Sequence, residues 1–166
     1  MRRAVISGLG AVTPVGNDVP TTWANLVAGR SGVDVISRFD ASDYPVTIAA
    51  EVKGFDVATV MPVKEARKTG LEVHYGVAAA MEAARDSGFE LTDPSRAGVI
   101  IGSAVGGLPQ ILEQHEVLQQ RGRERVSPHW LPNMLVDTTT SHVATQLGWR
   151  GVNYAIVSAC ASGSHA

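Results

Sequence analysis

The sequence contains one cysteine, no long hydrophobic run and no excess of positive charge. A single cysteine, Cys160, excludes a framework of internal disulfides. No apolar stretch reaches the roughly 20 residues that a membrane-spanning helix requires, and the N-terminus lacks the cleavage pattern of a signal peptide. The formal net charge of -2 gives no general attraction for nucleic acid or an anionic membrane. We therefore expect a reduced, cytoplasmic protein without nucleic-acid or membrane partners.

The rest of the composition is typical of a folded domain. The chain has 166 residues, of which 45% are hydrophobic and 18% charged, so it is long and apolar enough to form a core. It contains no internal repeat, no low-complexity segment and no obvious linker. We expect a single domain over residues 1–166.

Short apolar runs alternate with segments of helical periodicity. The apolar runs predict strands over residues 4–6, 46–52, 97–103 and 152–159. The periodic segments predict helices over residues 19–28, 72–87, 109–118 and 132–146. Asp18 is expected to cap the first helix, and Gly29, Gly88 and Gly148 are expected to end three of them. Strands that alternate with helices indicate the α/β class.

Two of these segments carry a packing prediction. One helix has an apolar stripe at spacings of three and four residues, formed by Val73, Val77, Ala80, Met81 and Ala84. The strand over residues 97–103 is apolar on both faces, so we expect layers on both sides of it.

Two glycine-rich segments invite comparison with nucleotide-binding loops. The segment "GLGAVT" at Gly8 lacks the third glycine of the dinucleotide fingerprint, and "IGSAVGG" at Gly102 lacks the Gly-Lys-Ser/Thr of a phosphate loop. We interpret both as places where the backbone turns tightly or approaches another segment closely.

Cys160 stands between an apolar run and a run of small residues, in "NYAIVSACASGSHA". A thiol attacks as its thiolate, and a helix N-terminus favours that anion through unpaired N–H groups and the helix dipole. If the strand delivers Cys160 to the start of a helix, its backbone N–H also faces the place where the oxyanion of an attacked thioester develops. The alternative is a buried cysteine that acts as a small hydrophobic side chain.

A series of motifs covers essentially the whole chain: "MRRAVISGLGAVTPVGNDVPTTWANLVAGRSGV", "RFDASDYPVTIAAEV", "KEARK", "IIGSAVGGL", "VSPHWLPNML" and "LGWRGVNYAIVSACASGSHA". In this order they resemble the β-ketoacyl-[acyl-carrier-protein] synthases of the type II elongating class. The resemblance implies a thiolase-like fold with α-β-α-β-α layers, of which this chain holds part of the N-terminal half, ending just after the nucleophile. It also implies a homodimer that uses no cofactor, because its substrates are carried as phosphopantetheine thioesters on acyl carrier protein.

The activity that the resemblance implies is a decarboxylative Claisen condensation in fatty-acid or polyketide synthesis. An acyl group moves from the carrier protein to Cys160, the nucleophile, whose backbone N–H matches one oxyanion donor. Malonyl-carrier protein then loses carbon dioxide, and its carbanion attacks the thioester on Cys160. The product is a 3-oxoacyl-carrier protein that is two carbons longer.

Six further residues match positions with roles in the family. Val105 matches a side chain at the floor of the acyl pocket, and Trp130 matches a pocket residue supplied across the dimer, where it is expected to influence chain-length preference. Both residues are equally typical of core packing. Four basic residues match positions that face the acidic carrier protein: Lys64, Arg67, Lys68 and Arg125. Such charges would steer an acidic partner, although a solvated charged face is the simpler interpretation of any one of them.

The sequence departs from the family pattern in its length and in one motif. The segments that carry the two catalytic histidines, a supporting lysine and the second oxyanion donor of the family are absent from it. We therefore expect a fragment of a longer enzyme, rather than a short protein that has lost catalysis, and we expect no condensation by this chain alone. The family usually has Met-Asp and an aromatic residue where this chain has Thr69, Gly70 and Leu71–Glu72.

The histidines of the chain are expected to be structural or surface residues: His74, His115, His129, His142 and His165. His165 follows Cys160 by five residues, which on a helix is an unfavourable spacing for contact with the sulfur. Two other functions remain open. The chain could be a non-catalytic partner subunit of a full-length synthase, or a degradative thiolase, although in thiolases the nucleophile comes much earlier in the chain.

Overall fold

The computed structural model describes residues 3–166, and their contacts divide the chain into two units. Unit 1 contains the residues up to Asp56 and Ala78–Phe89, and unit 2 contains Val57–Val77 and Glu90–Ala166. Helix α3 (Leu71–Ser87) contributes residues to both units, so no linker-like segment marks the division. The expectation of a single domain stays a prediction.

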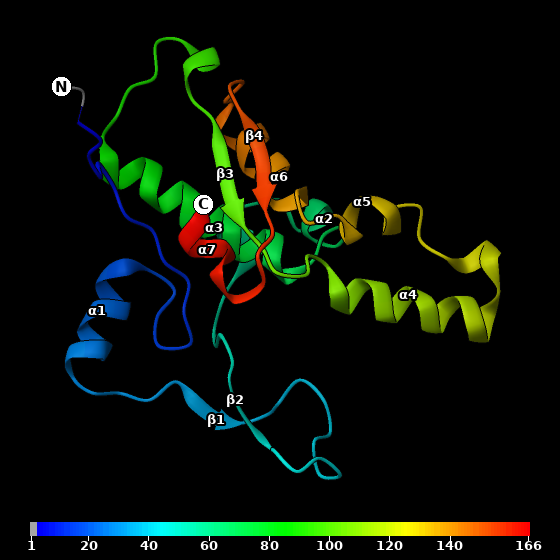
Figure 1. The fold of residues 1–166 in the computed structure, drawn as a ribbon. Helices are drawn as coiled ribbons and strands as arrows, with labels where there is room; N and C mark the ends of the chain where they lie inside the picture. Colours follow the sequence, from blue (N-terminus) through cyan, green and yellow to red (C-terminus); the bar gives the residue numbers. More distant parts are fainter. Residues whose placement is uncertain (1–2) are drawn as a thin grey trace. The chain divides into compact units, whose positions relative to one another are not determined.

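Helices and two small sheets make up the described chain (Figure 1). Besides α3, the α-helices are α1 (Val19–Val27), α2 (Val63–Ala66), α4 (Leu108–Arg121), α5 (Trp130–Met134), α6 (Thr138–Leu147) and α7 (Ser162–His165). Short 3-10 turns occur at η1 (Val57–Thr59), η2 (Pro94–Arg96), η3 (Arg123–Arg125) and η4 (Ala159–Ala161). The strands are β1 (Val33–Val35), β2 (Ile48–Ala50), β3 (Val99–Gly102) and β4 (Asn153–Ile156). Within residues 3–166, no helix has both the length and the apolar character needed to cross a membrane.

In unit 1, helix α1 begins at the predicted residue and ends one residue earlier than predicted, at Val27. Asp18 has an extended backbone and its Oδ1 accepts the N–H of Thr21 at 2.7 Å. Hydrogen bonding by the Thr21 side chain and, secondly, by its backbone N–H lowers the pKa of Asp18 below its usual value. The helix ends before Gly29, whose φ of 66° is the left-handed conformation that favours glycine. Trp23 and Leu26 remain 67% and 56% exposed, so unit 1 does not use the apolar face of α1 as core.

The strand predicted over residues 4–6 is not formed. This segment has no regular secondary structure, and Val5 and Ile6 are 82% and 83% exposed. An extended segment becomes a strand when a neighbouring strand accepts its N–H groups, and none of the four described strands pairs with it. The prediction was wrong because an apolar pattern indicates a tendency to be buried but does not supply a partner.

Two carboxylates of α3 hold the N-terminal segment of unit 1. Glu82 accepts the N–H of Ala11 at 2.9 Å and the N–H of Val19 at 2.8 Å, and Asp86 accepts the N–H of Leu9 at 2.9 Å. Val19 is the first residue of α1. Glu82 therefore places a negative charge at the N-terminus of that helix, where the dipole favours it.

The glycines of "GLGAVT" allow this close contact with α3. A Cβ atom on Gly8 would overlap the carbonyl oxygen of Ala83, and one on Gly10 would overlap the carbonyl oxygen of Ala79. Our interpretation of this segment as a close backbone approach is confirmed.

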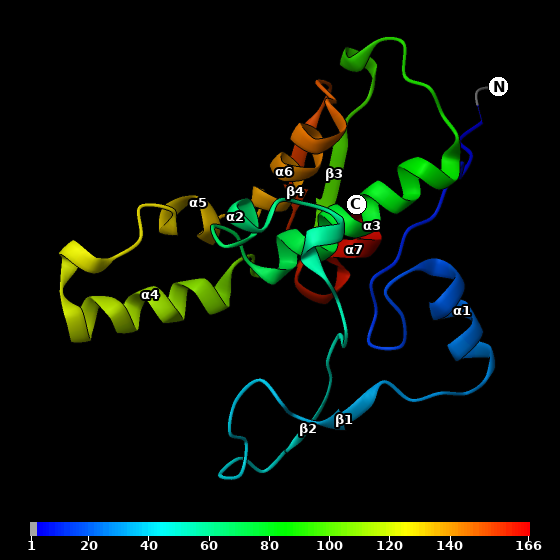
Figure 2. The same ribbon diagram turned by 180° about the vertical axis from the view of Figure 1, so that it is seen from behind.

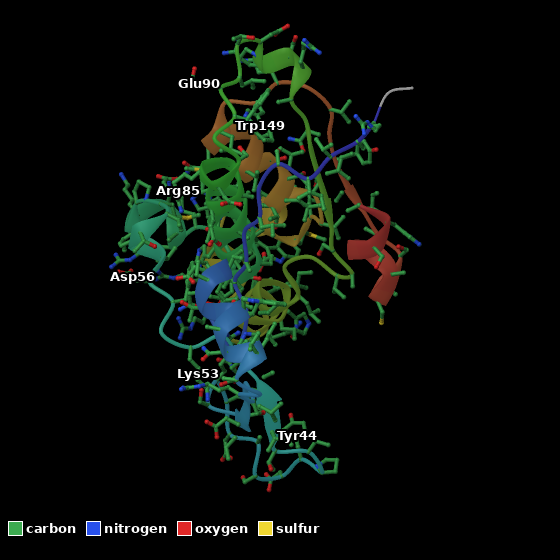
Figure 3. All side chains as sticks on the ribbon, turned by 90° about the vertical axis from the view of Figure 1, so that its left-hand side faces the viewer. Tyr44, Lys53, Asp56, Arg85, Glu90 and Trp149 are labelled. Atoms are coloured by element: carbon green, nitrogen blue, oxygen red, sulfur yellow. The ribbon has the colours of Figure 1, made fainter. Side chains whose placement is uncertain are left out.

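Strands β1 and β2 form a small antiparallel hairpin in unit 1, with Val33 opposite Ala50. Strand β2 confirms, in a shorter form, the strand predicted over residues 46–52, whereas β1 was not predicted. Lys53 and Asp34 form an exposed ion pair across the hairpin at 2.6 Å. Tyr44 lies in the loop that joins the strands (Figure 3).

Unit 2 is built around the parallel pair β3 and β4, in which Val99 lies opposite Asn153 and Gly102 lies opposite Ile156. Helix α6 runs along one side of this pair (Figure 2). Helix α7 contacts β3 at the carboxyl end of the strand. Both strands confirm predicted strands, although each is shorter than the apolar run that predicts it.

The core of unit 2 lies where α3, α6 and the strands meet. Val73, Val77 and Thr140 are completely buried, which confirms the first two members of the apolar stripe. A Cβ atom on Gly76 would overlap the side chain of Thr139, so α3 and α6 approach each other closely there. In contrast, Ile100 of β3 is 40% exposed. Within the described residues, the face of β3 that carries Ile100 is therefore only partly covered, and the expectation of layers on both sides of this strand stays a prediction.

The single helix predicted over residues 132–146 is divided into α5 and α6. Leu135 has an extended ψ of 139° and breaks the helix. The hydroxyl of Thr138 donates to the carbonyl oxygen of Pro132, and the hydroxyl of Thr140 donates to the carbonyl oxygen of Asp137 at 2.7 Å. Threonine hydroxyls that bond to nearby backbone groups compete with a continuous helix. The periodicity did not reveal the break, although the predicted stop at Gly148 is confirmed by its left-handed φ of 68°.

Candidate active site around Cys160

Cys160 lies in a short turn between β4 and α7 of unit 2. It is a free and exposed cysteine, in the middle of the 3-10 turn η4. The preceding residue, Ala159, has a φ of 50° and is the one non-glycine residue with a positive φ within residues 3–166. Such a conformation is costly for alanine, because its Cβ crowds the backbone. The thiol is therefore presented at the surface by a strained turn.

Side-chain hydrogen bonds hold this turn. Ser162, which is 3% exposed, accepts the N–H of Ser158 at 2.9 Å through its Oγ and donates to the carbonyl oxygen of Ala159 at 2.7 Å. Ser158 Oγ lies 2.8 Å from Nδ1 of His165. These contacts join the end of β4 to α7 on both sides of Cys160.

Strand β3 supports the turn from behind. A Cβ atom on Gly102 would overlap the backbone carbonyl of Ser162, so only glycine permits this approach. The interpretation of "IGSAVGG" as a close backbone approach is confirmed at Gly102, because this residue contacts the backbone of Ser162, two residues after Cys160.

The arrangement around Cys160 can support nucleophilic chemistry. The sulfur is accessible, and Cys160 is the second residue of a helical turn, where a backbone N–H has no partner within the helix. An N–H in that position can stabilise an oxyanion that forms on an acyl group attacked by the sulfur. Helix α7 has four residues, which is too short for the dipole effect that we expected from a full helix.

The two predicted pocket residues are not brought together. Trp130 lines a pocket of about 640 Å³. The other lining residues belong to α4, η3 and the segment between η3 and α5: Ile111, Leu112, Gln114, His115, Leu118, Arg123 and Val126. Val105 is 52% exposed and does not line this pocket, nor does Cys160. The pocket role of Val105 and Trp130 stays a prediction.

Three of the four predicted carrier-protein contacts share one short segment. Lys64 lies in α2, and Arg67 and Lys68 directly follow it. Lys68 Nζ forms an ion pair with Glu65 Oε1 at 2.8 Å, and this hydrogen bond lowers the pKa of Glu65 below its usual value. Arg125 belongs to a different element, η3.

The histidines have different surroundings. His74 is buried, and its Nε2 lies 3.0 Å from both Thr69 Oγ1 and the carbonyl oxygen of Ala66. Burial lowers the pKa of His142 below its usual 6.5. His165 is exposed but bonds to Ser158, a contact that the sequence analysis missed. Helical spacing gives no signal for this contact, because Ser158 lies outside any helix and the positive φ of Ala159 turns the chain between the two residues.

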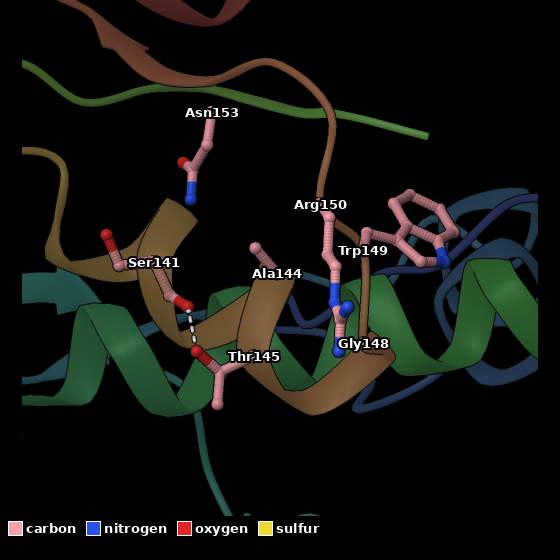
Figure 4. A pocket seen from close by; sticks show the side chains of 7 residues that line it. All are labelled: Ser141, Ala144, Thr145, Gly148, Trp149, Arg150 and Asn153. Carbon is pink, nitrogen blue, oxygen red and sulfur yellow. Dashed lines mark hydrogen bonds between the residues drawn. The ribbon is translucent and has the colours of Figure 1, made fainter. Parts of the chain in front are cut away.

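A second, polar pocket lies at the other end of β4 (Figure 4). It has a volume of about 420 Å³, and its lining includes Arg150, Asn153 and Thr145. Asn153 begins β4, whereas Cys160 follows its end, so this pocket does not contain the thiol. No group of three His, Cys, Asp or Glu side chains that could hold a metal ion occurs in the described part of the chain.

Residues 1–166 match the family model described as "Beta-ketoacyl synthase, N-terminal domain". The chain belongs to this family. The resemblance noted in the motifs is confirmed, and the nucleophile motif of the resemblance coincides with the exposed Cys160 turn.

Relatives of known name agree with the family. The chain is 43% identical to "3-oxoacyl-[acyl-carrier-protein] synthase 2" of Coxiella burnetii and 41% identical to the protein of that name from Vibrio cholerae. In both cases the alignment covers 99% of this chain but 40% of the relative. The chain therefore spans about two fifths of the length of these synthases.

Solved structures confirm the thiolase-like fold class. A beta-ketoacyl synthase from Burkholderia phymatum has a TM-score of 0.78 and 29% identity, with all of this chain and 42% of that protein aligned. The ishigamide ketosynthase/chain length factor has the same TM-score of 0.78 at 24% identity, over 92% of this chain and 39% of the other. The chain accordingly holds part of the N-terminal half of this layered α/β fold.

Proposed function

We propose that this chain is the nucleophile-bearing part of an elongating 3-oxoacyl-[acyl-carrier-protein] synthase, an acyltransferase of fatty-acid or polyketide assembly. The observation that carries the proposal is the exposed Cys160 in a strained, hydrogen-bonded turn of a chain from the ketosynthase family. In the first half-reaction, Cys160 Sγ attacks the carbonyl carbon of an acyl thioester. The carbonyl oxygen becomes negatively charged, and the backbone N–H of Cys160 donates to it.

Collapse of this intermediate breaks the carbon–sulfur bond of the incoming thioester and leaves the acyl group on Cys160. The phosphopantetheine sulfur leaves as a thiolate and takes up a proton, in balance with the one that Cys160 loses when it attacks. In the second half-reaction, malonyl-carrier protein loses carbon dioxide, and the resulting carbanion attacks the Cys160 thioester. The histidines and lysine that the resemblance assigns to this step belong to the part of the family fold that this chain does not span. We therefore expect acyl transfer to Cys160 but no condensation by these residues alone.

The proposed partner is acyl carrier protein. One structural neighbour is a "type II PKS acyl-carrier protein in complex with its ketosynthase". On this chain, the exposed Lys64 and Arg67, together with Lys68, would steer an acidic carrier protein, with Arg125 as a further contact. The pairing of Lys68 with Glu65 reduces the free positive charge of this segment.

The remaining parts of the proposal concern the acyl pocket and the assembly. We propose a homodimer in the cytoplasm, in which Val105 and Trp130 contribute to the acyl pocket, and a reaction that needs no cofactor. The half-buried, apolar surroundings of Trp130 are compatible with a pocket wall. The alternative of a non-catalytic partner subunit is less well supported, because the function of such a subunit does not require an exposed thiol on a strained turn.

Acylation of Cys160 tests this function. The chain would be incubated with acyl-carrier protein and analysed by intact-mass and peptide mass spectrometry, with Cys160→Ala as the matched control. We expect one acyl group on Cys160 in the parent and none in the control. A parent that stays unacylated, while iodoacetamide still labels Cys160, would contradict the proposed acyl transfer and favour the non-catalytic subunit.

A further inference from the structure

Ser158 and His165 stand on either side of Cys160 and are joined by a hydrogen bond. Ser158 Oγ and His165 Nδ1 lie 2.8 Å apart. Ser158 follows β4 by two residues and directly precedes η4, and His165 is the last residue of α7. This hydrogen bond therefore closes the stretch of backbone that presents the thiol.

The same stretch contains a backbone conformation, that of Ala159, which is stable only when neighbouring residues hold it. Ala159 has a φ of 50°, a left-handed conformation that alanine rarely adopts because its Cβ crowds the backbone. Strained residues persist only when the surrounding contacts fix them. Within the turn, Ser162 supplies two of these contacts from inside, and the Ser158–His165 hydrogen bond supplies one at the surface.

We propose that Ser158 and His165 are positioning residues for Cys160. Their hydrogen bond holds the turn so that the Cys160 N–H is directed at the developing oxyanion while Sγ forms its bond to the carbonyl carbon. This inference rests on the proposed acyl transfer, because only that reaction needs the N–H and the sulfur in a fixed relation. Neither side chain is required to touch the reacting atoms.

Two reactions of the same sulfur separate positioning from general structural support. Alkylation by iodoacetamide needs an accessible thiolate but forms no oxyanion, whereas acyl transfer from an acyl pantetheine thioester needs both. We expect Ser158→Ala and His165→Ala to slow acyl transfer about tenfold, as the loss of one positioning hydrogen bond predicts. Alkylation of Cys160 is expected to stay within about twofold of the parent rate, since the thiol remains exposed.

Conservative variants provide the rescue. Ser158→Thr keeps the hydroxyl, and His165→Asn places an amide where Nδ1 of the ring lies. Both are expected to restore acyl transfer to within about twofold of the parent. Ser164→Ala is the matched control, because Ser164 is an exposed residue of the same helix α7 and should leave both rates unchanged.

The outcomes distinguish this inference from the proposed function. If the parent is acylated and both alanine variants are acylated equally fast, the positioning role is overturned and the proposed function stands. If acyl transfer and alkylation fall in parallel, the pair is merely structural, which also overturns the inference. If the parent is not acylated at all, the proposed function is overturned, and this inference with it.

Discussion

At the scale of single residues, a strained backbone conformation lies directly next to the reactive thiol. Ala159 adopts a positive φ directly before the exposed Cys160. The buried hydroxyl of Ser162 offsets this cost by bonding to both Ser158 and the carbonyl of Ala159. Gly102 leaves room for the backbone of Ser162. A strained backbone that neighbouring side chains fix in this way is typical of sites whose geometry matters for function.

His142 carries a pH-dependent contribution to stability. Burial lowers the pKa of His142 below 6.5, Glu65 of α2 opposes this effect, and His74 of α3 adds to it. The unfolded chain therefore binds a proton on His142 more tightly than the folded chain does. The contribution of neutral His142 to the free energy of unfolding is present above pH 6.5 and is lost as the pH falls through the lowered pKa. We expect His142→Gln to remove part of the acid sensitivity, as measured by urea unfolding above and below that pH.

The control for this prediction is His115→Gln. His115 is exposed on α4, so its substitution should leave the pH dependence of unfolding unchanged. The same pH dependence in the His142→Gln variant and in the parent would contradict the assignment to His142.

At the scale of elements, carboxylates of α3 fix the start of the chain. Glu82 accepts two backbone N–H groups, from Ala11 and Val19, whereas Asp86 accepts one, from Leu9. Removal of Glu82 leaves two donors without their partner, including one at the N-terminus of α1. We expect Glu82→Ala to lower the free energy of unfolding by about 2 kcal/mol and Asp86→Ala by about half as much.

Urea unfolding of the two alanine variants checks this ranking, and Glu82→Gln tests its electrostatic part. The amide keeps one accepting oxygen, so its loss of stability should lie between those of the parent and Glu82→Ala. An equal loss for Glu82→Ala and Asp86→Ala would show that the second hydrogen bond of Glu82 contributes nothing.

The sequence predicts elements well where it contains their local signals. Asp18, Gly29 and Gly148 mark helix ends correctly, because a capping carboxylate and a left-handed glycine act through the neighbouring backbone. The break at Leu135 has no such signal in the sequence. It depends on which backbone carbonyl group accepts the hydrogen bond of a nearby threonine hydroxyl, here that of Thr138. The segment over residues 4–6 has the composition of a strand but no partner among the described strands.

The candidate site was predictable in its nucleophile but not in its support. Cys160 was evident from its flanking motif, and the structure confirms its exposure. The left-handed Ala159 was not predictable, because alanine gives no indication of a positive φ. The bond between Ser158 and His165 depends on how the turn folds back. Sequence spacing alone therefore could not distinguish His165 from a surface histidine.

At the scale of the whole molecule, large apolar side chains lie exposed in both units. In unit 1, Val5 and Ile6 are more than four fifths exposed, and in unit 2, Tyr154 and Val157 next to the thiol turn are 47% and 54% exposed. Contiguous exposed apolar surface is typical of regions that contact another protein or another part of the same protein. The chain spans 40% of the length of its synthase relatives, and we propose that the rest of the family fold covers these side chains when it is joined to this chain.

A chimera tests this explanation together with the proposed activity. Residues 1–166 would be fused to the part of the Coxiella burnetii synthase that follows the aligned region. We expect the chimera to bind less of the apolar dye ANS than the chain does, because the added segment covers apolar side chains. It should also form 3-oxoacyl-carrier protein from acyl and malonyl donors.

The variant Cys160→Ala of the chimera separates the two effects. It should lower the rate of product formation by about a thousandfold or more, because the nucleophile is removed. Its dye binding should stay low, because the covering surface is unchanged. Undiminished dye binding would contradict the covering role, and product formation without the thiol would contradict Cys160 as the acyl acceptor.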